Sequence, residues 1–235
     1  MSVMDFETGA VLLMNKPHKW TSFDVVNYVR KIAKAKVGHA GTLDPLATGL
    51  LILCTGKMTK KIDEYQAQEK EYTGTITLGA TTPSYDLETS VDKTFSISHL
   101  TEEKIKDAAH SLTGILQQMP PLYSAKRIDG ERAYHKARRG ENVAVTAREV
   151  TVSVFEITTI DFAETTVNAH FRIVCSKGTY IRSLARDLGE ILETGGHLTE
   201  LCRTRIGEFL LQNAHTIEDL RVMFPTQKLN ADLTD

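Results

Sequence analysis

Asp44 is the residue whose type and setting most directly suggest chemistry. It stands in the stretch Gly38-His39-Ala40-Gly41-Thr42-Leu43-Asp44-Pro45-Leu46-Ala47-Thr48-Gly49, which an apolar run follows. Glycines let the backbone take positive φ and approach a ligand, and Pro45 keeps Asp44 out of the helical region. A carboxylate in such a loop can act as a nucleophile or stabilise a developing charge. A lone Asp before Pro is also a common turn residue, so the neighbouring positions must decide.

A phosphate-binding P-loop is the obvious rival for a Gly-rich segment here, and its spacing fails. Gly56-Lys57 is followed by Met58, where Ser or Thr is required, and Leu51 stands where the first glycine of the pattern belongs. The chain therefore carries no nucleotide-phosphate loop at this place.

The Asp44 segment resembles the loop that carries the catalytic aspartate of pseudouridine synthases. It agrees with the pattern of the bacterial tRNA pseudouridine-55 synthase (TruB) family, Gly-His-x-Gly-x-Leu-Asp-Pro-x-Ala-x-Gly, at every fixed position. The resemblance implies an isomerase that converts uridine 55 in the T-loop of tRNA to pseudouridine. Such a reaction breaks the N1–C1′ bond of a flipped uridine, turns the base and joins C5 to C1′. It implies neither a cofactor nor a metal.

Further segments resemble the same family, and they assign roles to residues outside the loop. Tyr72, in Lys70-Glu71-Tyr72, matches the tyrosine that stacks on the target uracil, and His39 matches the histidine near the flipped nucleotide. Without the motif, Tyr72 is interpreted as a half-buried strand residue and His39 as a loop residue without a special role.

A second specific match is Cys175-Ser176-Lys177-Gly178-Thr179-Tyr180-Ile181-Arg182-Ser183-Leu184. The resemblance implies that Arg182 pairs with the catalytic Asp44, and that Tyr180 lies against the target base as the candidate base for the C5 proton. Leu201 matches the aliphatic residue that closes the apolar wall of the pocket. The plain alternatives are that Arg182 is a helical arginine paired with another acid, and that Leu201 is a core residue.

Residues 121–148 resemble the thumb loop with which the family closes over RNA. Its basic residues Arg132, Lys136 and Arg138 are candidates for phosphate contacts. A solvated basic helix is the competing interpretation of this segment.

The opening Lys16-Pro17 resembles the family's first motif, which supports the Asp44 loop. Asn15 and Lys19 depart from it, because the family has Asp and Gly at these positions.

Two other function classes stay open. One is a non-catalytic RNA-binding module. The presence of the full set Asp44, Tyr72, Tyr180 and Arg182 argues against it. The other is a carboxylate-dependent hydrolase, which would need a second acid or a water-activating partner that the sequence does not reveal.

The composition is that of a water-soluble protein. The 235 residues are 41% hydrophobic and 25% charged, with a net charge of −2. Positive charge is concentrated in residues 16–60, with eight basic against two acidic side chains, and in residues 121–150, with seven against four. Three widely spaced cysteines fit neither a disulfide framework nor a zinc site. We expect a cytoplasmic monomer that binds the T-stem and loop of tRNA, with no membrane segment and no protein partner.

The order of elements predicts an α/β (α+β) fold with a mixed, largely antiparallel sheet and flanking helices, as in pseudouridine synthases. Strands are expected at 11–15, 49–55, 72–78, 150–160, 165–175, 198–205 and 208–211, and helices at 22–32, 101–112, 131–139, 179–193 and 217–224. We expect a catalytic domain over 1–215, then a helix and loose tail over 216–235, without the separate C-terminal RNA-binding domain of many family members.

Overall fold

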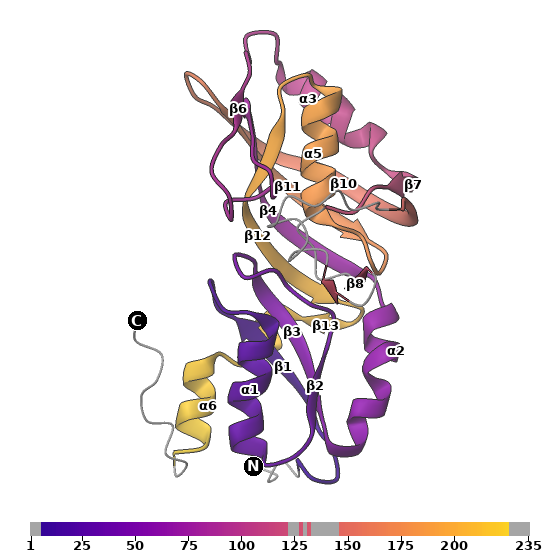
Figure 1. Ribbon diagram of the computed structural model, residues 1–235, viewed down its shortest axis with the longest axis vertical. Coiled ribbons are helices and arrows are strands. Elements are labelled where there is room, and N and C mark those ends of the chain that lie inside the picture. Colours follow the sequence, from indigo (N-terminus) through magenta and orange to yellow (C-terminus); the bar gives the residue numbers. More distant parts are fainter. Residues whose placement is uncertain (1–5, 122–126, 129–130, 133–145, 226–235) are drawn as a thin grey trace. The chain divides into compact units, whose positions relative to one another are not determined.

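The computed structural model describes residues 6–121, 127–128, 131–132 and 146–225. The chain divides into two compact units, residues 1–68 with 202–235 and residues 69–201 (Figure 1). The second boundary falls inside strand β12 (Gly196–Ile206). Among the described residues, no helix combines the length and the apolar character that crossing a membrane requires.

The first unit is built around β3 (Thr48–Thr55). This strand pairs antiparallel with β1 (Val11–Lys16) and with β2 (Val37–Ala40), and parallel with β12 at Cys202 and Arg203. β13 (Phe209–Leu210) pairs with the end of β12. The helical segments of this unit are α1 (Ser22–Ala33), the 3-10 turn η1 (Gly56–Lys61), α2 (Ile62–Ala67), the 3-10 turn η2 (Leu211–Asn213) and α6 (Ile217–Met223).

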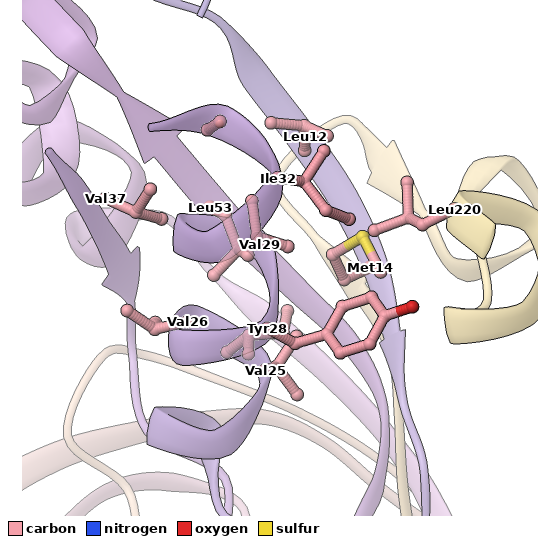
Figure 2. Close-up of a cluster of buried hydrophobic side chains, with 12 residues drawn as sticks. Leu12, Met14, Val25, Val26, Tyr28, Val29, Ile32, Val37, Leu53 and Leu220 are labelled. Carbon is pink, nitrogen blue, oxygen red and sulfur yellow. The ribbon is translucent and has the colours of Figure 1, made fainter. Parts of the chain in front are cut away.

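Helix α1 begins at a capping box. The Asp24 N–H donates to Thr21 Oγ1 and the Thr21 N–H donates to the Asp24 carboxylate, so two N–H groups at the helix start are satisfied. The apolar residues of α1 recur every three or four positions and pack on β1 and β3 (Figure 2). Leu220 of α6 adds to the same cluster.

The other face of β3 is also buried. Leu50, Ile52 and Cys54 pack there with Ala40 and Ile206 in a second apolar cluster. Because both faces of β3 are covered, its sequence is a continuous apolar run and not an alternating pattern. The strand is thus a rigid base for the loop that precedes it.

The second unit holds a sheet in the order β12, β4 (Lys70–Leu78), β11 (Val167–Cys175), β10 (Arg148–Phe162) and β7 (Gly114–Gln118). The pairs β4–β11, β11–β10 and β10–β7 are antiparallel. Helix α3 (Glu102–Ser111) packs against β10 and against α5 (Ile181–Ile191). Two short hairpin-like pairs complete the described part, β5 (Ala80–Thr81) with β6 (Lys93–Thr94) and β8 (Arg127–Ile128) with β9 (Glu131–Arg132).

The predicted fold class is confirmed, and outside the thumb segment each expected strand and helix is present with ends shifted by a few residues. Four features differ from the expectation. Gly38 and His39 belong to β2 and not to a loop, because β2 pairs with β3 from Val37 to Ala40. Strand β7 and helix α2 were not expected. In the thumb segment, residues 131–132 form β9 and not a helix, while Lys136 and Arg138 lie outside the described residues.

Candidate active site

Asp44 lies half-buried on the short loop that joins β2 to β3 in the first unit. Three buried side chains from three different elements hold this loop. They are Ser22 at the start of α1, Lys16 at the end of β1 and Arg203 on β12, each at most 2% exposed. The backbone that carries the carboxylate is therefore set by the packed body of the unit.

Ser22 fixes the residue before the carboxylate. Its hydroxyl accepts a hydrogen bond from the Leu43 N–H at 2.8 Å and donates to the Leu43 carbonyl at 3.2 Å. Ser22 is the first residue of α1, so the backbone beside Asp44 is tied to the start of this helix.

Lys16 holds the other side of the loop. Its ammonium donates to the carbonyls of Pro17 at 3.0 Å, Trp20 at 2.5 Å and Pro45 at 3.1 Å, which uses all three of its N–H groups. Burial lowers the pKa of Lys16 to about 8, against the opposing effect of the Asp44 and Asp24 charges. The group thus stays charged at neutral pH, in the supporting role that its motif implies.

Lys19, which departs from the family pattern, also contacts the loop. Its N–H donates to the Pro45 carbonyl at 2.9 Å, and its φ is +68°. This left-handed conformation is the one that glycine adopts without strain, which agrees with the glycine that the family has at this position.

Arg203 is the loop support that sequence reasoning missed. Its Nε donates to the Leu50 carbonyl at 2.7 Å and its terminal nitrogen to the Gly41 carbonyl at 3.1 Å, so it ties the two ends of the segment together. Gly49, with φ +103°, lies so close to the Arg203 backbone that a Cβ there would collide with it. The sequence places Arg203 two residues after Leu201, but only the fold shows what it contacts.

His39 lies on β2 opposite Leu53, two residues before Gly41. Its Nδ1 is buried and has no hydrogen-bond partner among the described residues. Burial lowers the pKa of His39, a backbone hydrogen bond with Gly41 opposes this shift, and the Arg203 charge adds to it. The imidazole is therefore neutral at pH 7, with a polar atom left for a further partner.

The second unit holds the other predicted catalytic residues. Tyr72 lies on β4 opposite Ile173 and is 8% exposed. Tyr180 is the N-cap residue of α5, and Arg182 follows in the first turn, 4% exposed. Leu201, half-buried on β12, is the last residue of this unit.

Asp86, a second buried carboxylate, was not found from the sequence. Arg182 Nε lies 3.6 Å from Asp86 Oδ2, and an Arg182 terminal nitrogen donates to the Ser84 carbonyl at 3.1 Å. The Glu88 N–H donates to Asp86 Oδ1 at 2.9 Å, which aims the carboxylate. Nearly a hundred residues of chain separate Asp86 from Arg182, so no local pattern could have revealed the pair.

The structure thus places Asp44 and His39 in the first unit and Tyr72, Tyr180, Arg182 and Leu201 in the second. Arg132 is on β9, and nothing further about the thumb residues falls in the described part of the chain. The chemical groups are a fixed carboxylate, a neutral imidazole, two tyrosines and a buried guanidinium. Carboxylates, imidazoles and tyrosines are side chains that take part in acid–base and nucleophilic chemistry.

The fold is that of the pseudouridine synthases. In a crystal structure of a Cbf5-Nop10-Gar1 complex, one chain matches with a TM-score of 0.71 and 29% identity, over 92% of this chain and 54% of that one. The chain therefore spans about half the length of that protein.

The family follows from the sequence comparisons. The model of the TruB family pseudouridylate synthase N-terminal domain matches residues 29–181, and that of the tRNA pseudouridylate synthase B C-terminal domain matches residues 182–233. The chain belongs to the TruB family of pseudouridylate synthases. The tRNA pseudouridine synthase B of Bacteroides thetaiotaomicron is 47% identical over 97% of this chain and 98% of its own length. The tRNA pseudouridine synthase B of Flavobacterium johnsoniae is 50% identical over 91% of this chain and 95% of its own length.

Proposed function

We propose that this protein isomerises uridine 55 in the T-loop of tRNA to pseudouridine, with Asp44 as the catalytic carboxylate. The observation that carries the proposal is the fixed placement of Asp44. In a chain of the TruB family, the motif carboxylate stands on a loop whose backbone buried Ser22, Lys16 and Arg203 hold by four hydrogen bonds, at Gly41, Leu43 and Pro45. A carboxylate supported in this way is preorganised for a reacting group.

The reaction balances without an oxidant or a second substrate. The N1–C1′ bond breaks, the uracil turns, and C5 bonds to C1′. The proton on C5 then leaves and N1 gains a proton. Asp44 acts as the nucleophile or as the stabiliser of the developing charge on the nucleoside.

The second unit supplies the remaining groups. Arg182 keeps the Asp44 carboxylate ionised, Tyr180 removes the proton from C5, and Tyr72 provides an aromatic surface for the target base. Stacking on such a surface is worth about 1–3 kcal/mol per base. This offsets part of the few kcal/mol that flipping a base out of its stack costs.

The substrate is assigned from the relatives and from charge. Curated relatives at 47–50% identity carry the name tRNA pseudouridine synthase B. The basic segments 16–60 and 121–150 are suited to RNA phosphates, whereas the chain as a whole is slightly acidic. We assign recognition to the T-stem and loop, with His39 and Leu201 beside the flipped nucleotide and the thumb residues Arg132, Lys136 and Arg138 on phosphates.

The proposal is tested with tRNA transcripts and an isolated T-arm hairpin, in which pseudouridine is mapped by adduct-dependent reverse-transcription stops. We expect one stop, at position 55, that is absent when cytidine replaces this uridine. A non-catalytic RNA-binding module would retain the RNA and give no stop. A hydrolase would release free uracil and leave an abasic site. Either result would contradict the proposal.

A further inference from the structure

Tyr180 is held in the second unit by two residues that no motif singled out, Gln118 and Arg148. These two residues stand directly opposite each other on the antiparallel strands β7 and β10. One contacts the backbone of Tyr180, and the other contacts its ring.

Gln118 pairs with the Tyr180 peptide through both ends of its side-chain amide. Its Oε1 accepts from the Tyr180 N–H at 2.8 Å, and its Nε2 donates to the Tyr180 carbonyl at 3.0 Å. Gln118 is 2% exposed, so neither bond competes with bulk water. Because Tyr180 caps α5 without a side-chain hydrogen bond of its own, Gln118 fixes the backbone from which the ring projects.

Arg148 lies over the aromatic face of Tyr180. Its guanidinium carbon is 4.2 Å from the ring centroid, which is the geometry of a cation–π contact. Gly178, with φ +84°, lies beside this guanidinium, since a Cβ there would be in van der Waals contact with it at 3.5 Å. Arg148 Nε is buried and has no hydrogen-bond partner among the described residues. The guanidinium therefore lies against both the Tyr180 ring and the turn at Gly178.

The surrounding contacts make the arrangement rigid. The Ser183 hydroxyl, in the first turn of α5, donates to the carbonyl of Met119, the residue after Gln118, at 2.8 Å. The Thr151 N–H donates to the Ser176 hydroxyl at 2.9 Å, and the Ser176 N–H donates to the Thr151 carbonyl at 2.8 Å. The ends of β7 and β10 and the start of α5 thus form one hydrogen-bonded assembly around Tyr180.

We propose that Gln118 and Arg148 are positioning residues that hold the Tyr180 ring at the orientation needed for the C5 proton step. The proposal rests on the proposed function of Tyr180. The new element is that the cross-strand pair Gln118 and Arg148 sets the position and orientation of the Tyr180 ring. Misplacing a reacting group by about 1 Å can cost about 100-fold in rate. Removing the contact of Gln118 or Arg148 with Tyr180 should therefore have a measurable effect on turnover.

The test combines a probe on the ring with the rate of the reaction. The tyrosines of the full-length protein are labelled with 3-fluorotyrosine, and the signal that Tyr180→Phe removes is assigned to Tyr180. Gln118→Met keeps the size of the side chain and removes both hydrogen bonds. Gln118→Glu keeps the acceptor for the Tyr180 N–H and loses the donor to its carbonyl. Gln117→Met is the matched control, on the exposed neighbouring position of β7.

We expect Gln118→Met to shift or broaden the Tyr180 fluorine signal. We also expect it to lower the single-turnover rate of tritium release from C5-labelled tRNA by about 10- to 100-fold, with the Kd for tRNA changed by less than about threefold. Gln118→Glu should lie between this variant and wild type, and Gln117→Met should match wild type. Arg148→Met should shift the Tyr180 signal, whereas Arg172→Met, which removes an arginine paired with Glu71 on the same sheet, should not.

If Gln118→Met does not fold, the results for Gln118→Glu and Arg148→Met decide whether the proposal holds. The proposal is overturned if the folded variants keep the wild-type Tyr180 signal and a rate within about twofold of wild type. It is also overturned if the signal moves and the rate does not. If wild type itself releases no tritium, the proposed function has failed, and the fluorine signals still show whether the pair holds the ring.

Discussion

At the scale of single residues, long cationic side chains hold the backbone around the candidate site. Lys16, Arg182 and Arg203 are each less than 5% exposed, and all three donate to main-chain carbonyls. A buried cation is costly unless its donors are satisfied, so these side chains stay where carbonyl oxygens meet them. Their charge also lies inside the protein, where it acts more strongly on nearby carboxylates than it would in water.

His39 gives a prediction for pH dependence. Its folded pKa lies below the ordinary value, because the buried imidazole is easier to keep neutral. The unfolded chain therefore takes up the proton first as the pH falls below about 6.5, and the stability contributed by neutral His39 is lost over this range. We expect the free energy of unfolding of wild type to fall more steeply between about pH 7.5 and about pH 5.5 than that of His39→Gln.

Urea unfolding followed by fluorescence measures this difference. Trp20 is the only tryptophan of the chain and lies in the same unit as His39, so its emission reports the relevant unfolding. Parallel pH dependences of the two proteins would show that His39 is not held neutral by the fold.

At the scale of elements, the start of α1 has two separable effects. Thr21 caps the helix, and Ser22 fixes the backbone at Leu43 beside Asp44. Ser22→Ala leaves the Leu43 N–H and carbonyl without their partner, which costs about 1–3 kcal/mol of stability. It should also lower the single-turnover rate by about tenfold, because Asp44 is less well held.

Thr21→Ala is the matched control for this prediction. It removes the capping box, at a cost of about 0.5–2 kcal/mol, and leaves the bonds to Leu43 in place. We expect it to lower the melting temperature without slowing the reaction. If the two variants slow the reaction equally, loss of helix stability and not loss of the Leu43 contact would be responsible.

The sequence predicted the main elements because their patterns are local. The capped helix after Thr21, the apolar run of β3 and the β-rich stretches of β10 and β11 are each legible within a dozen residues. Strand β2 was missed because its four residues include Gly38 and a polar histidine, and they form a strand only by pairing with β3. Asp86, Arg203 and Gln118 were missed for a related reason, since their partners lie between 62 and 162 residues away in the chain.

At the scale of the whole molecule, charge is distributed unevenly over a chain whose net charge is only −2. If residues 121–148 serve RNA phosphates, Arg132→Ala combined with Arg138→Ala should raise the Kd for tRNA. It should also reduce the slope of log Kd against log salt concentration by about two, one for each lost contact. The single-turnover rate at saturating tRNA should be unchanged.

Equilibrium binding over a range of salt concentrations checks this prediction. Arg172→Ala, in which the removed arginine is paired with Glu71 and Glu156, serves as the control for loss of positive charge in general. An unchanged slope in the double variant would mean that the thumb arginines make no phosphate contact.

The central claim is that Asp44 is the indispensable catalytic group, and single-turnover tritium release from C5-labelled uridine in tRNA tests it most directly. Asp44→Asn keeps the size of the side chain and removes its charge. Asp63→Asn, an exposed acid on α2 of the same unit, is the control. We expect Asp44→Asn to fold and bind tRNA like wild type and to lose at least about 10⁴-fold in rate, over about 5 kcal/mol of transition-state stabilisation. A variant that kept a tenth of the wild-type rate would show that Asp44 is structural, and the account would be contradicted.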